Sequence, residues 1–308
     1  MEIYLLKDGC EKVPGIPKEK LYEVEGDRIL LLNSAEFEEI FDKDKQTGAD
    51  ILNDMQLLKY CKAERRRGYV CGVVHAPRLR EAEQNAFSFG FYMDRHELWL
   101  VSDDDFIHRV KTMVFEETDA DDSLQDVLLG FFNNMIANDV MYLQKSEKHL
   151  EKYEESIIGG KCGNFHKTVI SYKKYISVCG AYYMQLSEIG DYMQNIFRNE
   201  ESGSRFGWEL FSDRAERLHN YTDTIQEYLT QLRELYQSQI DINQNRIMTI
   251  LTVVTTLVLP LSLIAGWYGM NFTNMPELHW KYSYLAVAVV SVLIIAVEIY
   301  YFKKKKIL

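Results

Sequence analysis

Basic residues are scarce in this chain of 308 residues. It has 35 Lys and Arg against 46 Asp and Glu, which gives a formal net charge of -11 at pH 7. Proteins that bind nucleic acid cluster Lys and Arg against the phosphates, so the acidic balance argues against a nucleic-acid partner. It suits a protein whose surface meets cations or simply stays soluble.

Cysteines are few and scattered. The chain has five, none of them in a C-x-x-C pair and none at the spacing of a Cys/His metal site. Such a set fits reduced thiols that face the cytosol better than it fits a disulfide framework. Residues 1–13 carry charges and lack the apolar core of a signal peptide. We therefore expect the bulk of the chain to lie in the cytoplasm.

Sequence signatures of enzymes are also missing. The chain contains no G-x-S-x-G, Walker A, Rossmann, kinase or H-E-x-x-H motif. Without a nucleophile constellation or a nucleotide-binding loop, we expect neither enzymatic catalysis nor ATP hydrolysis.

What the chain does have is two long hydrophobic runs near its C-terminus. Residues 247–267 contain no charged side chain, and residues 282–302 contain one, Glu298. At about 1.5 Å per residue, about 20 such residues cross a hydrocarbon core of ~30 Å. Helices of soluble proteins rarely stay uncharged on every face for so long. We therefore predict two transmembrane helices, an extracytoplasmic loop at residues 268–281 and a basic tail at residues 303–308.

The flanking charges predict the orientation of both spans. Arg246 precedes the first span and four lysines, Lys303 to Lys306, follow the second, whereas the loop has one Lys, one Glu and one His. The positive-inside rule then puts both termini in the cytoplasm. Aromatic belts are expected in the lipid interface, from Trp267, Tyr268, Trp280, Tyr282 and Tyr284 outside and from Tyr300, Tyr301 and Phe302 inside. These features predict a multi-pass protein of the cell membrane.

The first span carries a polar stripe. Its members recur every three or four residues: Asn245, Met248, Thr252, Thr255, Leu259 and Ser262, with Leu251 beside Thr252. The hydroxyl groups could bond neighbouring helices or line water, and the periodicity supports both interpretations equally. Because one pair of helices cannot enclose a pore, a pore requires several copies around one axis.

The first span ends in a short motif, Tyr268–Gly269–Met270–Asn271–Phe272. This YGMNF string, between two C-terminal spans, resembles the signature of the CorA family of magnesium channels. The resemblance extends to an N-x-x-M-x-x-L-T stretch that begins at Asn245, to Pro260 in mid-span, to the M-P-E-L loop at residues 275–278 and to the closing lysines. It is strong over residues 230–308.

The resemblance implies a function and a set of site residues. It implies a homo-oligomer, a pentamer by analogy, that passes Mg²⁺, with Co²⁺ or Ni²⁺ as further substrates, down its electrochemical gradient. The selectivity filter would be Gly269, Met270 and Asn271, and the pore would be lined by Asn245, Met248, Leu251, Thr252, Thr255, Leu259 and Ser262. Mg²⁺ gives up its water reluctantly, so a neutral carbonyl such as that of Asn271 suits the hydrated ion. Zinc-transporting relatives depart from the Gly-Met-Asn string, but a Zn²⁺ transporter remains an alternative.

Residues 1–122 are expected to form a cytoplasmic α/β domain. Strands are predicted at Ile3–Leu6, Ile29–Leu32 and Tyr69–Val74, and a hairpin at Ala86–Met93 and Leu98–Ser102. A helix should begin after Asn33, with Glu36 three residues later, and another should run from Asp103–Asp105 through Met113. The hairpin followed by a helix also resembles the N-terminal domain of CorA proteins.

Residues 123–210 are expected to be helical, in two segments, Ser123–Ser156 and Phe165–Phe197. A long stalk helix should then begin near Phe211–Asp213 and continue through residue 267, since it lacks Pro and Gly before Pro260. The predicted fold class is an α+β/α membrane protein with a cytoplasmic α/β head, a long helical stalk and two C-terminal transmembrane helices.

One regulatory site is suggested by the resemblance. Asp213, in an F-x-D string, resembles a carboxylate that binds Mg²⁺ between subunits in some family members. Counting back from Asn245 places Leu210 at that position instead, and an ordinary charged surface is the third interpretation. Because residues 1–210 match the family less well than the pore does, a membrane-anchored sensor with a ligand-gated pore is the alternative function.

Overall fold

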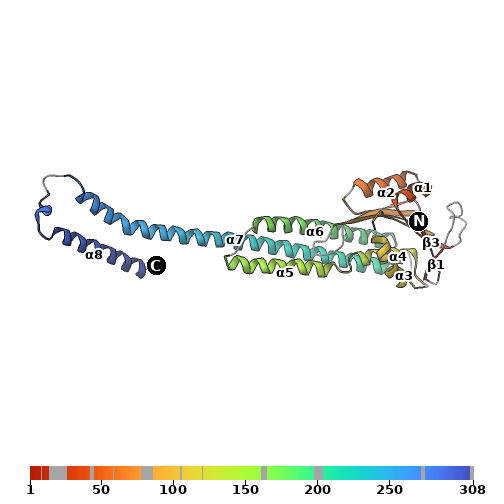
Figure 1. The fold of residues 1–308 in the computed structure, drawn as a ribbon. Coiled ribbons are helices and arrows are strands. Elements are labelled where there is room, and N and C mark those ends of the chain that lie inside the picture. The colour runs from red at the N-terminus through yellow and green to blue at the C-terminus, as the bar shows by residue number, and fades with distance from the viewer. Residues whose placement is uncertain are drawn as a thin grey trace. The chain divides into compact units, whose positions relative to one another are not determined.

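The computed structural model describes residues 1–7, 9–13, 26–41, 45–57, 59–77, 86–104, 106–119, 121–160, 165–197, 204–271 and 275–305 (Figure 1). Of the residues invoked above, Asp105, Phe272 and Lys306 lie outside this part of the chain. The chain divides into two compact units, Met1–Leu232 and Arg233–Leu308, which are described separately.

The first unit contains a seven-stranded sheet in the order β2-β1-β3-β7-β6-β5-β4. The strands are β1 (Glu2–Lys7), β2 (Gly9–Lys12), β3 (Asp27–Leu32), β4 (Lys62–Arg66), β5 (Tyr69–Ala76), β6 (Phe87–Met93) and β7 (Glu97–Val101). Neighbouring strands are antiparallel except β3 and β7, which are parallel. The predicted strands and the predicted hairpin are confirmed. Strands β2 and β4 were not predicted, because they are the two polar edges and bury no apolar face of their own.

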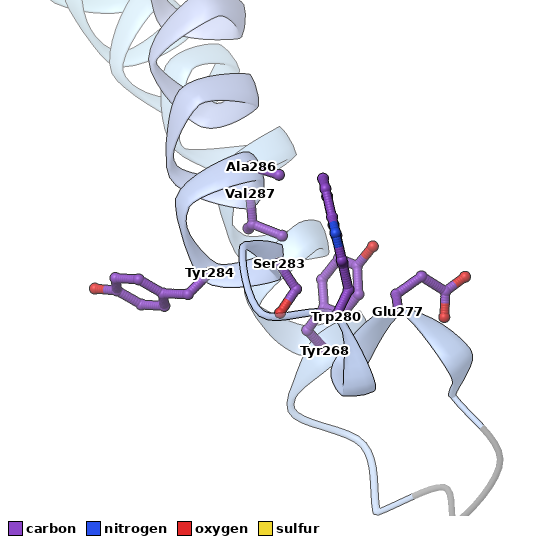
Figure 2. A pocket seen from close by; sticks show the side chains of 7 residues that line it. All are labelled: Tyr268, Glu277, Trp280, Ser283, Tyr284, Ala286 and Val287. Carbon is purple, nitrogen blue, oxygen red and sulfur yellow. The ribbon is translucent and has the colours of Figure 1, made fainter.

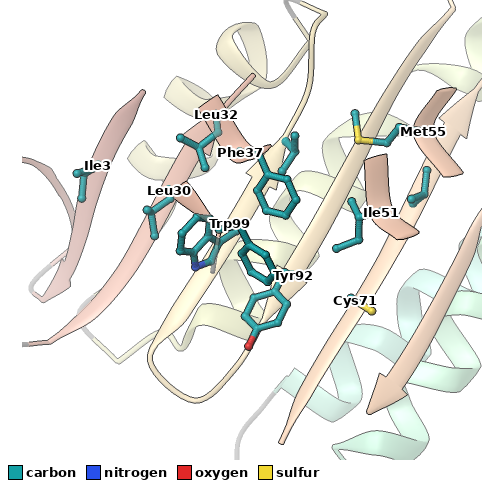
Figure 3. Packing of buried hydrophobic residues seen from close by; sticks show 12 residues of the cluster. Ile3, Leu30, Leu32, Phe37, Ile51, Met55, Cys71, Tyr92 and Trp99 are labelled. Atoms are coloured by element: carbon teal, nitrogen blue, oxygen red, sulfur yellow. The ribbon is translucent and has the colours of Figure 1, made fainter. Parts of the chain in front are cut away.

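One face of the sheet packs against α1 (Ser34–Ile40) and α2 (Lys45–Leu57). The predicted start of α1 is confirmed by a capping box, in which the Asn33 side chain accepts from the Glu36 amide and the Glu36 carboxylate accepts from the Asn33 amide. Aromatic rings fill the layer between the sheet and these helices, and Figure 3 shows Phe37 beside Trp99. The Phe37 and Trp99 ring centroids are 6.0 Å apart, in an edge-on arrangement.

The opposite face of the sheet packs against α3 (Phe106–Glu116) and α4 (Leu124–Met135). Phe132 of α4 is fully buried, and its ring lies 5.9 Å from that of Phe91 in β6. The same ring lies 5.2 Å from Trp208 in the next helical layer. Phe132 therefore connects the sheet to the helices that follow it.

A buried ion pair crosses the parallel strands of this sheet. Arg28 of β3 pairs with Glu97 of β7, which lies directly opposite in the register, and both side chains are buried. The indole Nε1 of Trp99 donates a second hydrogen bond to Glu97, at 2.9 Å. The carboxylate is thus satisfied by two donors, which offsets part of the cost of burying its charge.

Three long helices complete the first unit: α5 (Asp139–Ile158), α6 (Phe165–Ile196) and the N-terminal part of α7 (Ser204–Tyr268). Tyrosines of α7 reach carboxylates of α5 at two levels one heptad apart, Tyr221 to Glu147 and Tyr228 to Glu154. These two hydrogen bonds fix the register of the two helices relative to one another.

Two predicted helix limits in this region are wrong. The predicted helix Ser123–Ser156 is interrupted at residues 136–138, where α4 ends and α5 begins. Asn134 there bonds the carbonyl of Gly130, as short polar side chains do when they compete with helical bonding. The stalk helix starts at Ser204, not near Phe211, because its first turns bury Trp208 and Phe211. Tertiary packing therefore extends the helix N-terminally.

The second unit consists of the rest of α7, a short 3₁₀ helix η2 (Pro276–His279) and α8 (Ser283–Lys304). α7 continues as one helix through Pro260. Both α7 and α8 contain stretches long and apolar enough to cross a membrane. The only residues of α7 and α8 buried in this unit are Val253 and Phe302, among those described.

Candidate ion pathway and selectivity filter

One face of α7 is shielded within the second unit. The less exposed residues of its apolar stretch are Thr249, Val253, Leu257, Pro260, Leu261 and Ile264. They recur every three or four residues and therefore lie on one side of the helix. A matching row on α8 includes Val287, Ser291 and Phe302. These two rows are the faces through which the two helices of this unit can pack against each other.

The predicted pore-lining residues lie on the other face. Asn245, Met248, Leu251, Thr252, Thr255, Leu259 and Ser262 are all exposed. Leu259 is 72% exposed, whereas Val253 is 7% exposed. At about 100° per residue, the centre of the pore-lining set lies roughly 140° around the helix from Val253. The polar stripe therefore lies on the side of α7 opposite its shielded row.

The hydroxyl groups of this stripe have a specific orientation. Thr252 Oγ1 donates to the Met248 carbonyl and Thr255 Oγ1 donates to the Leu251 carbonyl, each at 2.8 Å. Each hydroxyl proton is thus used within the helix, and each oxygen keeps lone pairs free to accept. Water bound to a cation turns its hydrogens outward, so a row of acceptors suits a hydrated cation. Met248, Leu251 and Leu259 alternate with these acceptors and supply apolar constrictions.

The predicted filter begins where α7 ends. The Gly269 amide donates to the Ala265 carbonyl at 2.9 Å, and the Met270 amide donates to the Trp267 carbonyl at 3.4 Å. Met270 and Asn271 are exposed, and the Asn271 side chain makes no hydrogen bond to any described residue. Its amide is therefore available to a ligand or to a second copy of the chain.

The backbone of Gly269 does not adopt a positive φ. Among the described glycines, positive φ occurs at Gly9, Gly26, Gly68 and Gly160 only. What requires glycine at this position is space, because a Cβ atom added to Gly269 would lie 2.9 Å from the Ala265 carbonyl oxygen. That distance is shorter than a carbon–oxygen contact allows, and the oxygen belongs to the helix backbone.

A cavity of about 390 Å³ lies next to the end of α7 (Figure 2). It is lined by Tyr268, Glu277, Trp280, Ser283, Tyr284, Ala286 and Val287. Tyr268 directly precedes Gly269, so the residues that hold its ring also direct the start of the filter. The sequence assigned these aromatic residues to a lipid belt and did not predict the cavity. The sequence feature that indicates a structured loop here is Pro276, which favours the first turn of η2. Trp280 follows η2 directly and lines the cavity.

The predicted regulatory carboxylate belongs to the first unit. Asp213 and Leu210 are both exposed on α7. Asp213 lies on an acidic face that the sequence analysis missed, together with Glu209, Glu216, Asp223 and Glu227, which are all exposed. The sequence signal was their spacing of three, four or seven residues, which places them on one face of a helix. Within the described part of one chain, no group of three or more His, Cys, Asp or Glu side chains is placed to hold a metal ion. A metal site that uses Asp213 therefore requires ligands from elsewhere, such as a second copy.

Comparison with known protein families gives one match over most of the chain. The family model described as CorA-like Mg²⁺ transporter protein matches residues 33–304. Two similar curated proteins are the cobalt/magnesium transport protein CorA of Thermotoga maritima and the magnesium transport protein CorA of Wolinella succinogenes. The first is 38% identical over 94 residues, 30% of this chain and 27% of that protein. The second is 43% identical over 89 residues, 29% of this chain and 28% of that protein. The matched segment thus spans less than a third of either relative.

Solved structures match over nearly the full length. The complete structure of the CorA magnesium transporter from Methanocaldococcus jannaschii has a TM-score of 0.81, with 98% of this chain and 96% of that chain covered, at 19% identity. The full-length CmaX protein has a TM-score of 0.73, with 99% and 97% covered, at 12% identity. At such identities the likeness concerns the fold. It confirms the predicted class, with a mixed α/β head, a long helix and two apolar C-terminal helices.

Proposed function

The chain belongs to the family of CorA-like Mg²⁺ transporter proteins, a family of transporters and not of enzymes, and on that premise we propose that it is a homo-oligomeric channel for Mg²⁺. The observation that carries the proposal is the uncovered stripe of α7. It bears hydroxyl and amide acceptors, although it belongs to a stretch apolar enough to lie in a membrane. Acceptors facing lipid would be unfavourable, so several copies should turn this face toward a common water-filled axis.

Asn271 is proposed to select the ion at the outer mouth of the pore. Mg²⁺ keeps its octahedral water shell more tightly than other common cations do. Neutral carbonyl oxygens from several Asn271 side chains can accept hydrogen bonds from that shell, while each NH₂ group braces a neighbour. A ring of carboxylates would bind the ion more strongly and slow its release. Co²⁺ and Ni²⁺ are proposed as further substrates.

The membrane orientation is part of the proposal. Lys303, Lys304 and Lys305 follow the apolar part of α8, and Arg246 precedes that of α7. These charges favour a cytoplasmic position for both ends and an extracytoplasmic position for the loop with Gly269. Since no ATP-binding motif is present, the ion should move down its electrochemical gradient.

Regulation by Mg²⁺ itself is proposed at the acidic face of α7 that includes Asp213. At an effective dielectric constant near 20, two unit charges ~4 Å apart repel by roughly 4 kcal/mol. If Asp213 faces carboxylates of a neighbouring copy, bound Mg²⁺ would relieve this repulsion and hold the closed arrangement. Loss of the ion would then favour opening.

Flux into liposomes tests the proposed function. The purified full-length protein is reconstituted with a Mg²⁺-sensitive dye inside the vesicles, and external Mg²⁺ is added with and without an inward-negative potential. We expect dye signal that rises with the potential, since the ion is charged and no pump is present. Protein-containing vesicles that admit no more Mg²⁺ than empty ones, at low internal Mg²⁺, would overturn the proposal.

A further inference from the structure

A second cavity lies in the first unit, far along the chain from the proposed pore. Its volume is about 220 Å³, and it is lined by Arg65, Gly68, Tyr69, Val70, Met93, Asp94, Arg95, Gln125, Ile196 and Phe197. The turn between β4 and β5 meets the turn between β6 and β7 here, next to α4 and the end of α6. One arginine near the end of β4 and one in the β6–β7 turn thus line one cavity of an acidic protein.

The side chains of Arg65 and Arg66 point to opposite faces of the sheet, because successive residues of a strand alternate. Arg66 is neutralised on the α2 side, where it donates to Thr47 at 2.7 Å and to Asp50 at 2.9 Å. Arg65 lies toward α6, and its backbone amide donates to the Tyr192 hydroxyl at 2.9 Å. The guanidinium of Arg65 forms no ion pair with any described carboxylate.

The carboxylate in the cavity wall is engaged in its own turn. Asp94 Oδ1 accepts from the backbone amides of His96 at 3.0 Å and Glu97 at 2.9 Å, and its Oδ2 accepts from the Tyr92 hydroxyl at 3.3 Å. These bonds fold the β6–β7 turn and fix the position of Arg95. Arg95, like Arg65, has no ion pair with a described side chain.

We propose that this cavity binds an oxyanion of the phosphate type through Arg65 and Arg95. A guanidinium offers two parallel donors that match two oxygens of a phosphate, and two such groups in the wall of one cavity can hold one tetrahedral anion. The ligand is either free phosphate or the terminal phosphate of a nucleotide, which share this chemistry. Phosphate groups are also ligands of Mg²⁺. A phosphate site in the first unit would therefore respond to anions that bind the same ion that the channel is proposed to carry. The inference stands apart from the transport function.

Calorimetric titration of the full-length protein in detergent tests the site. Inorganic phosphate and ATP are titrated separately, at low ionic strength and without divalent cations, into the wild type and into Arg65→Gln, Arg95→Gln and Arg67→Gln. Arg67 is the matched control, because it is an exposed arginine of the same turn that does not line the cavity. We expect Arg65→Gln and Arg95→Gln each to weaken binding roughly tenfold or more, and Arg67→Gln by less than about threefold.

Each outcome is decisive. Tighter binding of ATP than of inorganic phosphate identifies a nucleotide as the ligand, and the reverse order identifies free phosphate. Absence of heat with both anions overturns the proposal, and so does equal weakening by Arg67→Gln, which would indicate a diffuse charge effect. Arg95 lies in an exposed turn, so Arg95→Gln keeps the test valid if melting shows that Arg65→Gln is misfolded.

Discussion

Asn271 is the residue on which the proposed selectivity depends. Its side chain is exposed at the end of α7, with an amide that no described residue engages. A neutral amide can accept from the water of a hydrated cation with its oxygen and donate to a neighbouring copy with its nitrogen. A hydroxyl has one oxygen for both roles, and a carboxylate has no donor and adds charge. Because the oxygen and the nitrogen of Asn271 have separate roles, substitutions that remove one or both of them have predictable effects on transport.

Replacing Asn271 by Ala should remove the oxygen without adding bulk. Since a net hydrogen bond contributes about 0.5–1.5 kcal/mol and the loss recurs in every copy, Mg²⁺ uptake per channel should fall roughly tenfold or more. Asn271→Asp keeps an oxygen but adds charge, and should slow release and loosen discrimination among divalent ions. Uptake is measured per assembled oligomer in liposomes. Asn243→Ala, an exposed Asn of the same helix away from the stripe, is the control.

Normal uptake per channel in Asn271→Ala would move the selectivity site elsewhere. If the residue served only an ordinary turn, the substitution would reduce the amount of folded protein and leave each folded channel intact. Normalisation to the assembled oligomer separates these two cases.

Gly269 and Gly266 form a matched pair for a steric prediction. A Cβ atom at Gly269 would lie 2.9 Å from the Ala265 carbonyl oxygen, whereas a Cβ atom at Gly266 meets nothing within 4 Å beyond the neighbouring backbone of its own helix. Gly269→Ala should therefore strain the helix end by about 1–3 kcal/mol and lower the yield of assembled, conducting protein. Gly266→Ala should be tolerated, because Ala favours a helix by about 1 kcal/mol over Gly. Thermal melting and uptake are compared for both. Equal tolerance of the two substitutions would contradict the steric explanation.

Asp139 should make the stability of the first unit depend on pH. Burial raises the pKa of Asp139 to about 7, against the lowering effects of the Tyr183 hydrogen bond and of Arg214. An Asp in the unfolded chain titrates near ~3.9, so the folded state holds this proton more tightly. The resulting stabilisation is complete below the unfolded pKa and is lost as the pH rises toward 7. The loss amounts to roughly 4 kcal/mol and is constant above the folded pKa.

Asp139→Asn should abolish this component of the pH dependence. Melting of the full-length protein in detergent is followed from pH 4 to pH 8 for the wild type and the variant. The variant should gain stability relative to the wild type as the pH rises to 7, and the difference should then level off. A difference that stays constant over the whole range would show that folding does not raise the pKa of Asp139.

At the scale of helices and strands, the elements that the sequence pattern did not predict are those that depend on tertiary packing. Strands β3 and β5 were predicted closely, because a short continuous apolar run is a local signal of a buried strand. β4 reads as Lys-Ala-Glu-Arg-Arg and was missed, since its pairing with β5 is the only reason it is a strand. The first turns of α7 likewise depend on burying Trp208 against Phe132, a contact between distant parts of the sequence. Long-range contacts of this kind leave no local pattern.

The candidate site also combines features that the sequence predicts with features that depend on tertiary structure. The motif and the polar stripe were readable, because both follow from residue type and helical spacing. The reason for Gly269 was not, because it depends on the position of one backbone oxygen.

The apolar positions of α7 should control leakage through the pore. Met248 and Leu259 are exposed on the uncovered face and would form rings that exclude water around the axis. Leu259→Asn or Met248→Asp should wet such a ring and raise leak conductance at high internal Mg²⁺. Currents are recorded in planar bilayers. Ile250→Asn places the same polar group on the side of α7 away from the stripe and should leave the leak unchanged. Unaltered currents in both pore variants would place the constriction elsewhere.

At the scale of the whole molecule, one chain leaves its proposed pore face without a partner. The shielded side of α7 is centred on Val253, and the opposite face, with Thr252 and Thr255, is exposed. Assembly should therefore be tested by contacts that only a ring of copies can make. The native thiols permit this, since Cys61, Cys71 and Cys179 are buried and Cys10 is partly exposed. A background with Cys10→Ser and Cys162→Ser removes the other two.

In that background, Thr252→Cys or Thr255→Cys should yield cross-linked products between copies on oxidation in the membrane. Around a closed axis these positions face one another across a narrow lumen, so a thiol on one copy reaches the equivalent thiol on the next. Val253→Cys is the matched control. It is adjacent in sequence but 7% exposed, so it should not cross-link. A monomeric mass in mild detergent together with no product from either threonine position would contradict the ring. Cross-linking through Val253→Cys alone would mean that the copies meet through the opposite face of α7, and the acceptor stripe would then face lipid instead of water.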